Sequence, residues 1–489
     1  MNNTPNILWI CTDQQRFDTL GCHGNSFVRT PHIDQLAREG TLFERAFSQS
    51  PVCTPSRARF LTGRYPRTTR TRQNGQDIPA DERLISKILA DAGYACGLSG
   101  KLHLSACHPS AARHMERRID DGYVNFHWSH HPATLRRPGG KSNNWPANEY
   151  DLWLRERGTE YSTKPFDGSR YVEEGMPAAD HQTTWCAQKA ISFMEANAGQ
   201  THSWMFSVNM FDPHHPFDPP REYLERYLDR LDEIPLPHYR AGELDDKPTV
   251  QKIDHQGAYG GRPGYFEFDK MTDRDHRLVK AAYWAMCDLI DDQVGRMLEA
   301  LERTGQRDNT IVIFMSDHGE MLGDHGIYLK GSYFYEEAVH VPLIISGPGL
   351  RAGARVQQMV ELVDLTPTLL DAAGLGRDPG MQGRSFLPLL KGEDMPGRDD
   401  IYSEYYNAMP WHPKEVNPQA TMLRTETLKL VAMHGQKEGE LYDLVADPLE
   451  TNNLWFDSAR TADKLDLYMR LCDRMAWTVD PLPLRRGEF

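Results

Sequence analysis

The run Asn6-Ile-Leu-Trp-Ile-Cys11 is apolar from its second residue onward and passes directly into the polar triplet Thr12-Asp13-Gln14. Four further short apolar runs occupy residues 94–98, 203–208, 310–315 and 341–345. Continuous rather than alternating apolarity is typical of strands buried on both faces, as in a parallel sheet. The first run therefore predicts one strand of a covered sheet, and the other runs predict its neighbours.

Helical patterns separate the predicted strands. Residues 31–39 and 84–92 have the apolar spacing of helices, and Gly93 ends the second pattern. Residues 280–303 form a longer amphipathic pattern that stops near Gly305. Strands that alternate with helices predict an α/β fold with a doubly wound, mostly parallel sheet.

The pattern of predicted secondary structure changes near residue 375. Residues 1–375 hold the predicted α/β part, with irregular stretches at about 105–181 and 219–271 that are rich in Pro, Gly, His, Trp and Tyr. Such excursions tend to build substrate pockets. Residues 376–489 predict a smaller α+β subdomain, with short antiparallel strands at 404–406, 420–424 and 427–431 and a closing helix at 465–475.

Composition narrows the classes of function. The 489 residues include 55 Lys plus Arg and 69 Asp plus Glu, which gives a formal net charge of −14. This acidic balance argues against nucleic acid as a partner, because nucleic-acid binders need a basic face. The hydrophobic content of 39% is enough for a packed core, so extensive disorder is excluded.

Several features bear on location. No apolar run approaches the roughly 18 residues of a membrane span, so we expect no membrane association. Met1 to Thr4 carries no basic region of a signal peptide. The cysteines have no Cys-x-x-Cys pair, which is typical of reduced thiols rather than a disulfide scaffold; they are Cys11, Cys22, Cys53, Cys96, Cys107, Cys186, Cys287 and Cys472. We therefore expect a cytoplasmic protein.

Polar clusters follow four of the predicted strands, at the ends where ligands bind in open α/β sheets. They are Thr12-Asp13-Gln14, Lys101-Leu-His103, Phe211-Asp-Pro-His-His-Pro216 and Ser316-Asp317-His318-Gly319. Asp13, Asp317 and His318 are candidate ligands of a hard divalent cation. The alternative is that Asp13 caps the next helix and that residues 317–319 form a simple turn.

The segment Cys53-Thr-Pro-Ser-Arg57-Ala-Arg-Phe-Leu-Thr-Gly63-Arg64 predicts a helix with Pro55 in its first turn and Gly63 at its end. Cys53 would then lie where free N–H groups and the helix dipole favour anions. Arg57 adds a guanidinium one turn later, matched to tetrahedral oxyanions. A nucleophile beside these groups points to attack on a sulfate or phosphate ester. The alternative is a structural, reduced cysteine.

These residues resemble the type I sulfatase family. The signature is Cys53-x-Pro55-Ser56-Arg57 followed by Leu61-Thr-Gly63-Arg64. Further family elements follow in the expected order: Gly100-Lys101-Leu-His103, Pro213-His214-His-Pro216, Ser316-Asp317-His318-Gly319-Glu320 and Lys330. The matches extend from Asn6 to about Leu454. The resemblance implies an alkaline-phosphatase-like α/β fold.

The resemblance also implies a chemistry. A separate formylglycine-generating enzyme would oxidise Cys53 to formylglycine, and its hydrate would attack sulfur to give a covalent sulfate hemiester. Asp13, Asp317, His318 and the modified Cys53 would hold one divalent cation, with Ca²⁺ preferred and Mn²⁺ or Mg²⁺ as alternatives.

Further roles follow from the same family pattern. Arg57 and Lys101 would orient the nucleophile, and His103 would help to deprotonate its second hydroxyl. Lys330 and His214 would contact the sulfate, with His214 protonating the leaving oxygen. The neighbouring His215 is an alternative to His214, and structural or solvated roles are the alternatives for these histidines and lysines.

The chain departs from the family at Gln14, where many sulfatases carry a second Asp. Choline sulfatases and phosphonate monoester hydrolases also carry Asp-Gln there, so the identity of the cation and of the ester stays open. Asn74, in Gln73-Asn-Gly75, is either a pocket donor, as in those relatives, or part of an Asn-Gly turn. Gln14 and Asn74 are thus the candidate substrate-binding residues. The cluster of His127, Trp128, His130 and His131 favours a polar loop over a second metal site.

The leading hypothesis is hydrolysis of a small sulfated substrate. A phosphonate monoester or phosphodiester hydrolase is the alternative on the same scaffold, since both substrates are tetrahedral oxyanions. An inactive oxyanion-binding protein with unmodified Cys53 is the third hypothesis. The sequence leaves the sulfated alcohol undetermined and an oligomer open.

Overall fold

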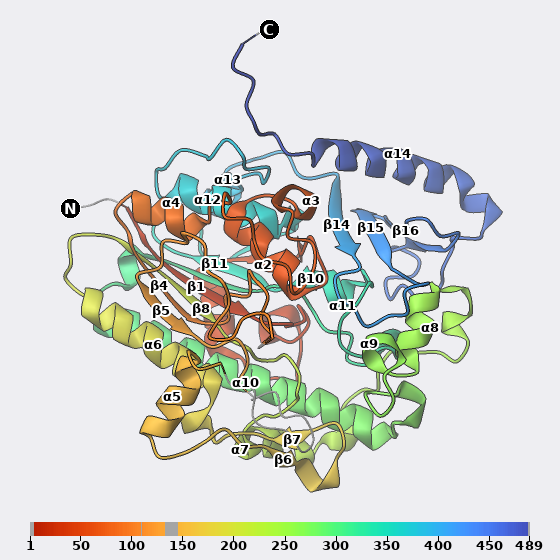
Figure 1. Ribbon diagram of the computed structural model, residues 1–489, viewed down its shortest axis with the longest axis horizontal. Helices are drawn as coiled ribbons and strands as arrows, with labels where there is room; N and C mark the ends of the chain where they lie inside the picture. Colours follow the sequence, from red (N-terminus) through yellow and green to blue (C-terminus); the bar gives the residue numbers. More distant parts are fainter. Residues whose placement is uncertain (1–3, 109, 133–144, 488–489) are drawn as a thin grey trace.

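The computed structural model describes residues 4–108, 110–132 and 145–487 (Figure 1). Met1 to Asn3, whose composition entered the signal-peptide argument, and part of the irregular stretch predicted at 105–181 lie outside the described residues. Among the described residues, none of the helices combines the length and apolar character that a membrane span requires.

An eight-stranded sheet forms the centre of the larger part, in the order β12-β2-β11-β9-β1-β8-β4-β5. Its middle strands are β9 (Thr310–Ser316), β1 (Asn6–Thr12), β8 (Trp204–Asn209) and β4 (Ala95–Gly100), and they run parallel. These four strands confirm four of the predicted ones. They are neighbours in space although they are far apart in the sequence, so their carboxyl ends share one edge of the sheet.

Helices cover both faces of this sheet (Figure 1). Alternate residues of β1 enter different cores: Ile7 and Trp9 pack on one face, and Leu8 and Ile10 pack on the other. The first face is covered by α2 (Cys53–Thr62), α4 (Ile85–Asp91), α12 (Leu365–Ala372) and α13 (Leu387–Lys391). The second is covered by α1 (Pro31–Glu39), α6 (Gln182–Asn197) and α10 (Asp273–Arg303). The doubly wound α/β prediction is confirmed.

Two sequence expectations about the sheet were wrong. The run at 341–345 is split at Pro342 into β10 (His340–Val341) and β11 (Leu343–Ser346), and β11 runs antiparallel to β9. Continuous apolarity reports burial on both faces and not strand direction. The stretch at 105–181 is also not wholly an excursion, because β5 (Asn125–Trp128) pairs in parallel with β4 as the edge strand.

Shorter elements complete the larger part. The outer strands on the other side of the sheet are β2 (Thr41–Phe43) and β12 (Ala354–Val356). Two small sheets comprise β3 (Ala46–Phe47), β10 and β13 (Val360–Glu361), and β6 (Lys164–Pro165) and β7 (Glu173–Glu174). The remaining α-helices here are α3 (Pro66–Thr69), α5 (Glu149–Glu156), α7 (Arg221–Leu228), α8 (Thr249–His255), α9 (Ala258–Gly261) and α11 (Glu336–Val339).

The smaller C-terminal subdomain holds an antiparallel sheet of β14 (Asp400–Tyr406), β15 (Gln419–Thr425), β16 (Leu428–Met433) and β17 (Gly439–Asp443), with α14 (Thr461–Trp477) packed on it. The division at residues 375 and 376 remains a proposal. Met381, Phe386 and Leu390 belong to the core of the larger part, which favours a division nearer to Asp400.

Candidate functional site

The predicted polar clusters lie together at the carboxyl ends of the middle strands. Asp13 follows β1, Asp317 follows β9, and Lys101 follows β4. Backbone hydrogen bonds tie these strand ends to one another: Asp13 N–H donates to the carbonyl of Asp212 at 3.2 Å, and Asp317 N–H donates to that of Thr12 at 3.3 Å. The sheet therefore fixes the spacing of the functional side chains.

Helix α2 presents Cys53 to this cluster from its first residue. The helix begins after Val52, whose side chain gives no cap, and Asn74 supplies the missing acceptor: its Oδ1 receives the Thr54 N–H at 3.0 Å. Gly63 ends the helix in the left-handed conformation, at φ 70°. Asn74 thus stabilises the start of the helix that carries Cys53.

The sulfur of Cys53 has polar neighbours of both signs. Its Sγ lies 3.1 Å from Nε2 of His318 and 3.5 Å from Oδ1 of Asp13. The ammonium groups of Lys330 and Lys101 lie 3.0 Å and 3.7 Å from the same sulfur. Cys53 is only 1% exposed, so these contacts form in a site of low dielectric.

Arg57 joins the two carboxylates. Its Nε donates to Oδ2 of Asp317 at 2.9 Å, and a terminal nitrogen donates to Oδ2 of Asp13 at 3.2 Å. The other terminal nitrogen donates to the carbonyl of Lys101 at 2.8 Å, while the Lys101 ammonium forms an ion pair with Asp13. The guanidinium is buried, and all three of its nitrogens donate hydrogen bonds within the protein. Arg57 therefore holds both carboxylates and the end of β4 in place.

The charges of these groups shift one another's pKa values. Burial alone raises the pKa of Asp13, but neighbouring cations, Lys101 foremost, hold it well below its usual range. Burial and Asp13 raise the pKa of the Cys53 thiol, but the ammonium groups of Lys101 and Lys330 outweigh them and lower it. The site therefore favours anions at both positions.

Gln14, the departure from the family pattern, bridges a cation and a carboxylate. Its Oε1 accepts from the ammonium of Lys330 at 2.7 Å, and its Nε2 donates to Glu320. Gln14 and Leu329, which precedes Lys330, have φ values of 67° and 68°. Positive φ is costly for residues other than glycine and persists where the surroundings enforce it, as at functional sites.

His103 lies in a loop whose backbone is held by hydrogen bonds to Glu116. The Glu116 carboxylate accepts the backbone N–H groups of His103, Leu104 and Ser105 at 2.8–3.3 Å and the indole N–H of Trp128 at 2.7 Å. This support holds His103 at φ 54°. Burial and the charge of Lys101 keep the pKa of His103 well below its usual range, so its imidazole is neutral at pH 7.

The two adjacent histidines after β8 have different neighbours. His214 Nδ1 contacts the backbone carbonyl of His215, and the two rings stack at 4.0 Å. His215 Nε2 lies 3.3 Å from the hydroxyl of Tyr259. Burial, followed by the charge of Lys330, lowers the pKa of both.

A divalent cation fits the residues at the centre. One ligand atom from each of Asp13, Cys53, Asp317 and His318 lies within 4.8 Å of the other three. Two carboxylates and one imidazole suit the hard cations Ca²⁺, Mg²⁺ and Mn²⁺. The predicted ligand set is therefore assembled in one place.

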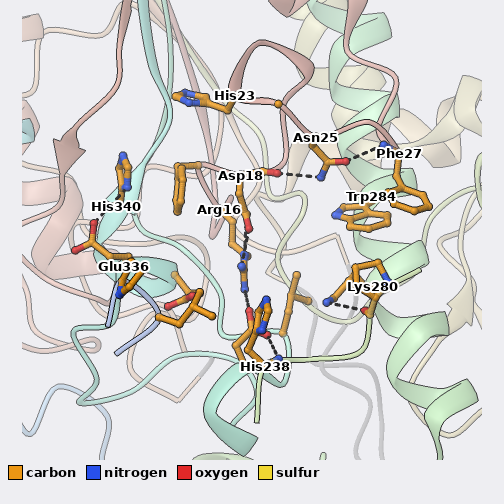
Figure 2. Close-up of a pocket in the computed structure, with 18 of the residues that line it drawn as sticks. Arg16, Asp18, His23, Asn25, Phe27, His238, Lys280, Trp284, Glu336 and His340 are labelled. Carbon is orange, nitrogen blue, oxygen red and sulfur yellow. Dashed lines mark hydrogen bonds and ion pairs between the residues drawn. The ribbon is translucent and has the colours of Figure 1, made fainter. Parts of the chain in front are cut away.

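A separate pocket of about 630 Å³ lies nearby, and we call it the Arg16 pocket (Figure 2). None of the predicted site residues lines it. Arg16 donates to Asp324 at 2.6 Å and to Asp18 at 2.6 and 2.8 Å, and Arg424 pairs with Glu336 at 3.2 Å. These lining charges already have partners, so the Cys53 cluster is the better candidate for chemistry.

Comparisons with known proteins agree with this geometry. Residues 5–375 match the family Sulfatase, and residues 323–476 match the family N-sulphoglucosamine sulphohydrolase, C-terminal. The chain belongs to the sulfatase family. An arylsulfatase of Clostridium perfringens (strain 13 / Type A) is 29% identical over 479 residues, which cover 95% of this sulfatase chain and 93% of the relative.

Two further relatives of this sulfatase bear on its substrate. A choline-sulfatase of Rhizobium meliloti (strain 1021) is 30% identical over 457 residues, covering 92% of this chain and 82% of the relative. The solved structure of a phosphonate monoester hydrolase of Agrobacterium radiobacter has a TM-score of 0.81 at 27% identity, covering 99% of this chain and 98% of that chain. The alkaline-phosphatase-like fold expected from the sequence is confirmed.

The sulfatase site also depends on residues to which the sequence assigned no role. They orient the functional groups and do not contact the Cys53 sulfur: Glu116, Glu320, Asp212 and Tyr283, whose hydroxyl contacts the Gln14 carbonyl and accepts the Arg16 N–H. Glu320 belongs to the family element that starts at Ser316, and Asp212 belongs to the polar cluster that follows β8. The sequence around Glu116 carries no signal of its role.

Proposed function

We propose that the protein hydrolyses sulfate esters, with formylglycine at position 53 as the nucleophile and one divalent cation held by Asp13, Asp317, His318 and residue 53. One observation carries this proposal: the side chain at the start of α2 is surrounded by carboxylates, an imidazole and two ammonium groups at the carboxyl ends of the strands. Membership of the sulfatase family supports the same class of reaction.

The charged groups of the site would divide the work of binding and orientation. Arg57, Lys101 and Lys330 bring three positive charges, which lie among the carboxylates of Asp13, Asp317 and Glu320. A divalent cation, when bound, would polarise an ester oxygen and favour the ionised nucleophile. Ca²⁺ remains our preference, with Mn²⁺ or Mg²⁺ as alternatives. Lys330, held by Gln14, would contact the sulfate group, and Arg57 and Lys101 would orient the nucleophile.

We assign the two proton transfers of the reaction to His103 and His214. A neutral His103 can accept the proton of a hydroxyl on the modified residue 53. His214 would donate a proton to the leaving oxygen. Its pKa is low partly because of Lys330, and an anionic sulfate group placed between them would raise it. Substrate binding thereby prepares His214 to act as an acid.

Hydrolysis of phosphonate monoesters or phosphodiesters is the second candidate. The pair Asp13-Gln14 and the similarity to the phosphonate monoester hydrolase favour it. Both kinds of ester carry a single negative charge on a tetrahedral group, so the cations of the site suit either. The family assignment and the named sulfatase relatives favour the sulfate ester.

The test begins with the nucleophile. The chain is expressed with and without a formylglycine-generating enzyme, and mass spectrometry of the peptide that contains Cys53 measures the conversion. Values of kcat/KM for a nitrophenyl sulfate and a matched phosphonate monoester then identify the ester. We expect turnover in proportion to conversion and a preference for sulfate. Equal turnover in both preparations, or a preference for the phosphonate, contradicts the proposal.

The remaining proposals concern partners and location. A small sulfated molecule is the proposed substrate, and the generating enzyme is a transient partner. We retain the sequence-based predictions of a cytoplasmic location and of no nucleic-acid partner, and an oligomer remains open.

A further inference from the structure

The histidines near residue 130, for which the sequence favoured a polar loop over a metal site, have separate partners. His127 Nδ1 pairs with Glu149 at 2.6 Å, and the His131 ring packs against Phe211 at 4.2 Å. His130 instead lies edge-on against the ring of His103, with their centroids 4.5 Å apart and their planes at 66°. The three rings therefore have different environments, and the ring of His130 contacts His103, a proposed proton-transfer residue.

His130 and His103 are joined by a thiol. One ligand atom each from His103, Cys107 and His130 lies within 4.8 Å of the other two. Cys107 is half-buried, and its sulfur contacts the carbonyl of Ser105 at 3.3 Å. This group is separate from the Asp13 cluster among the ligand groups found in the described residues.

The two imidazoles have unused nitrogens. Nδ1 of His103 and Nδ1 of His130 are both buried and have no hydrogen-bond partner among the described residues. A buried polar atom without a partner is costly and calls for an explanation. Burial keeps the pKa of each ring well below its usual range, so both are neutral, as metal ligands must be.

The donor types identify the class of metal. Two imidazoles and a thiolate are the ligands of Zn²⁺ and of similar borderline-soft cations, whereas Ca²⁺ and Mg²⁺ prefer oxygen. Zn²⁺ accepts three protein ligands and a water molecule. Zn–N and Zn–S bonds of about 2.0–2.3 Å need only small movements from ligand atoms that already lie this close.

We propose that His103, Cys107 and His130 form a second metal site, which takes Zn²⁺ and inhibits hydrolysis. On binding, the Cys107 thiol releases its proton to solvent and the thiolate coordinates the metal. His103 then gives a lone pair to the metal and cannot accept a proton from residue 53. The inhibition rests on the proposed function, but metal binding at this site does not.

The first experiment measures binding without turnover. The Cys53→Ala protein, loaded with Ca²⁺, is titrated with ZnCl₂ in a metal buffer, and alkylation of Cys107 by iodoacetamide is followed by peptide mass spectrometry. We expect one equivalent of Zn²⁺ by elemental analysis and at least about tenfold slower alkylation of Cys107. Bound zinc should fall in Cys107→Ser and in His130→Gln. It should not fall in the matched variants Cys22→Ser and His127→Gln.

The second experiment measures inhibition in the formylglycine-containing enzyme. Zn²⁺ should lower the rate of nitrophenyl sulfate hydrolysis, and Cys107→Ser and His130→Gln should each raise the inhibitory concentration at least about tenfold. Unprotected Cys107, or equal zinc binding in all variants, overturns the site. Protection of Cys107 without inhibition overturns the role of His103. If the formylglycine-containing enzyme hydrolyses no ester, the proposed function is refuted. The metal site is not, because zinc binding is measured without turnover.

Discussion

Charged side chains gather in two adjoining regions of the molecule, and they are arranged differently. Around Cys53, the cations Arg57, Lys101 and Lys330 lie among the carboxylates Asp13, Asp317 and Glu320, and two of the cations also contact the Cys53 sulfur. In the Arg16 pocket (Figure 2), the arginines form ion pairs with carboxylates of the same pocket. A buried charge is unfavourable unless a group of the opposite sign pairs with it.

The difference separates two uses of buried charge. The pairs of the Arg16 pocket join separate parts of the fold. Arg16, which follows β1, pairs with Asp324, which follows β9, and Arg424 of β15 pairs with Glu336 of α11. They need no ligand. The charges of the Cys53 region are instead arranged around a candidate nucleophile, because Lys101 and Lys330 both contact the Cys53 sulfur. We therefore expect substitutions around Cys53 to change turnover more than stability, and those around Arg16 to do the reverse.

The largest effect should come from Cys53. Cys53→Ala and Cys53→Ser remove the precursor of the proposed nucleophile and should lower kcat by at least about 10³-fold. The free energy of unfolding should change little, because both replacements are small and fit the start of α2. Turnover and urea unfolding measured on the same preparations test this. Substantial turnover in Cys53→Ala would remove the covalent mechanism.

Asp317 and Asp324 test the two regions directly with the same substitution. Asp317→Asn keeps the shape of the side chain but removes a charged ligand, so metal content and turnover should fall together, with kcat/KM lower by about 10²-fold or more. Asp324→Asn should keep its metal and lose about 3 kcal/mol of stability, because Arg16 loses a buried partner. Elemental analysis and urea unfolding provide the readouts. Full metal occupancy in Asp317→Asn would show that Asp317 is not a principal ligand.

His214 should matter most for poor leaving groups. His214→Ala removes the proposed acid, which typically contributes a factor of about 10² to 10⁴. Alkyl sulfates should therefore slow far more than an activated nitrophenyl sulfate. A plot of log kcat/KM against the pKa of the leaving group measures the difference as a steeper slope. Equal slowing across the series means that His214 only binds the sulfate group, and a steeper slope in His215→Ala alone assigns the acid to His215.

Much of the site could be predicted because the functional side chains follow strands directly. Asp13, Lys101 and Asp317 each lie within two residues of a strand end, and neighbouring strand ends in a parallel sheet meet at one edge. The sequence also located the start of α2, since Pro55 and Gly63 mark that helix.

The rest depends on contacts between distant parts of the chain. Glu116 supports His103 with backbone hydrogen bonds, and Glu320 holds Gln14 from 306 residues away. No local pattern encodes such pairs. The antiparallel direction of β11 was missed for a related reason, because apolarity reports burial alone. Asn74 was expected as either a pocket donor or a turn residue. It lies in a turn with Gly75, and its Oδ1 also accepts a hydrogen bond at the start of α2, a contact that the sequence did not predict.

The smallest expected effect concerns His325, a buried histidine beside the Arg16 pocket. His325 directly follows Asp324 and is buried, with its Nδ1 2.6 Å from Oε1 of Glu243 and its ring stacked on Tyr335 at 3.7 Å. Burial opposes protonation, but the carboxylates of Glu243 and Glu337 raise the pKa of His325 to about 9. The charged imidazole therefore stabilises the folded state without contacting Cys53.

The sign of the pH dependence follows from this raised pKa. The unfolded chain has the ordinary histidine pKa of about 6.5, so the stabilisation is complete below that pH and is lost as the pH rises toward 9. The loss amounts to at most about 3 kcal/mol. His325→Gln should flatten the fall in unfolding free energy between pH 6.5 and 9 while leaving kcat unchanged. His276→Gln is the matched control, because burial lowers the pKa of His276, so its removal should leave the slope of stability against pH unchanged between pH 6.5 and 9. Urea unfolding at several pH values gives the unfolding free energy of the parent and both variants. If the plot of this free energy against pH for His325→Gln runs parallel to that of the parent, His325 is neutral in the folded state. A charged His325 beside the Arg16 pocket then does not stabilise that region.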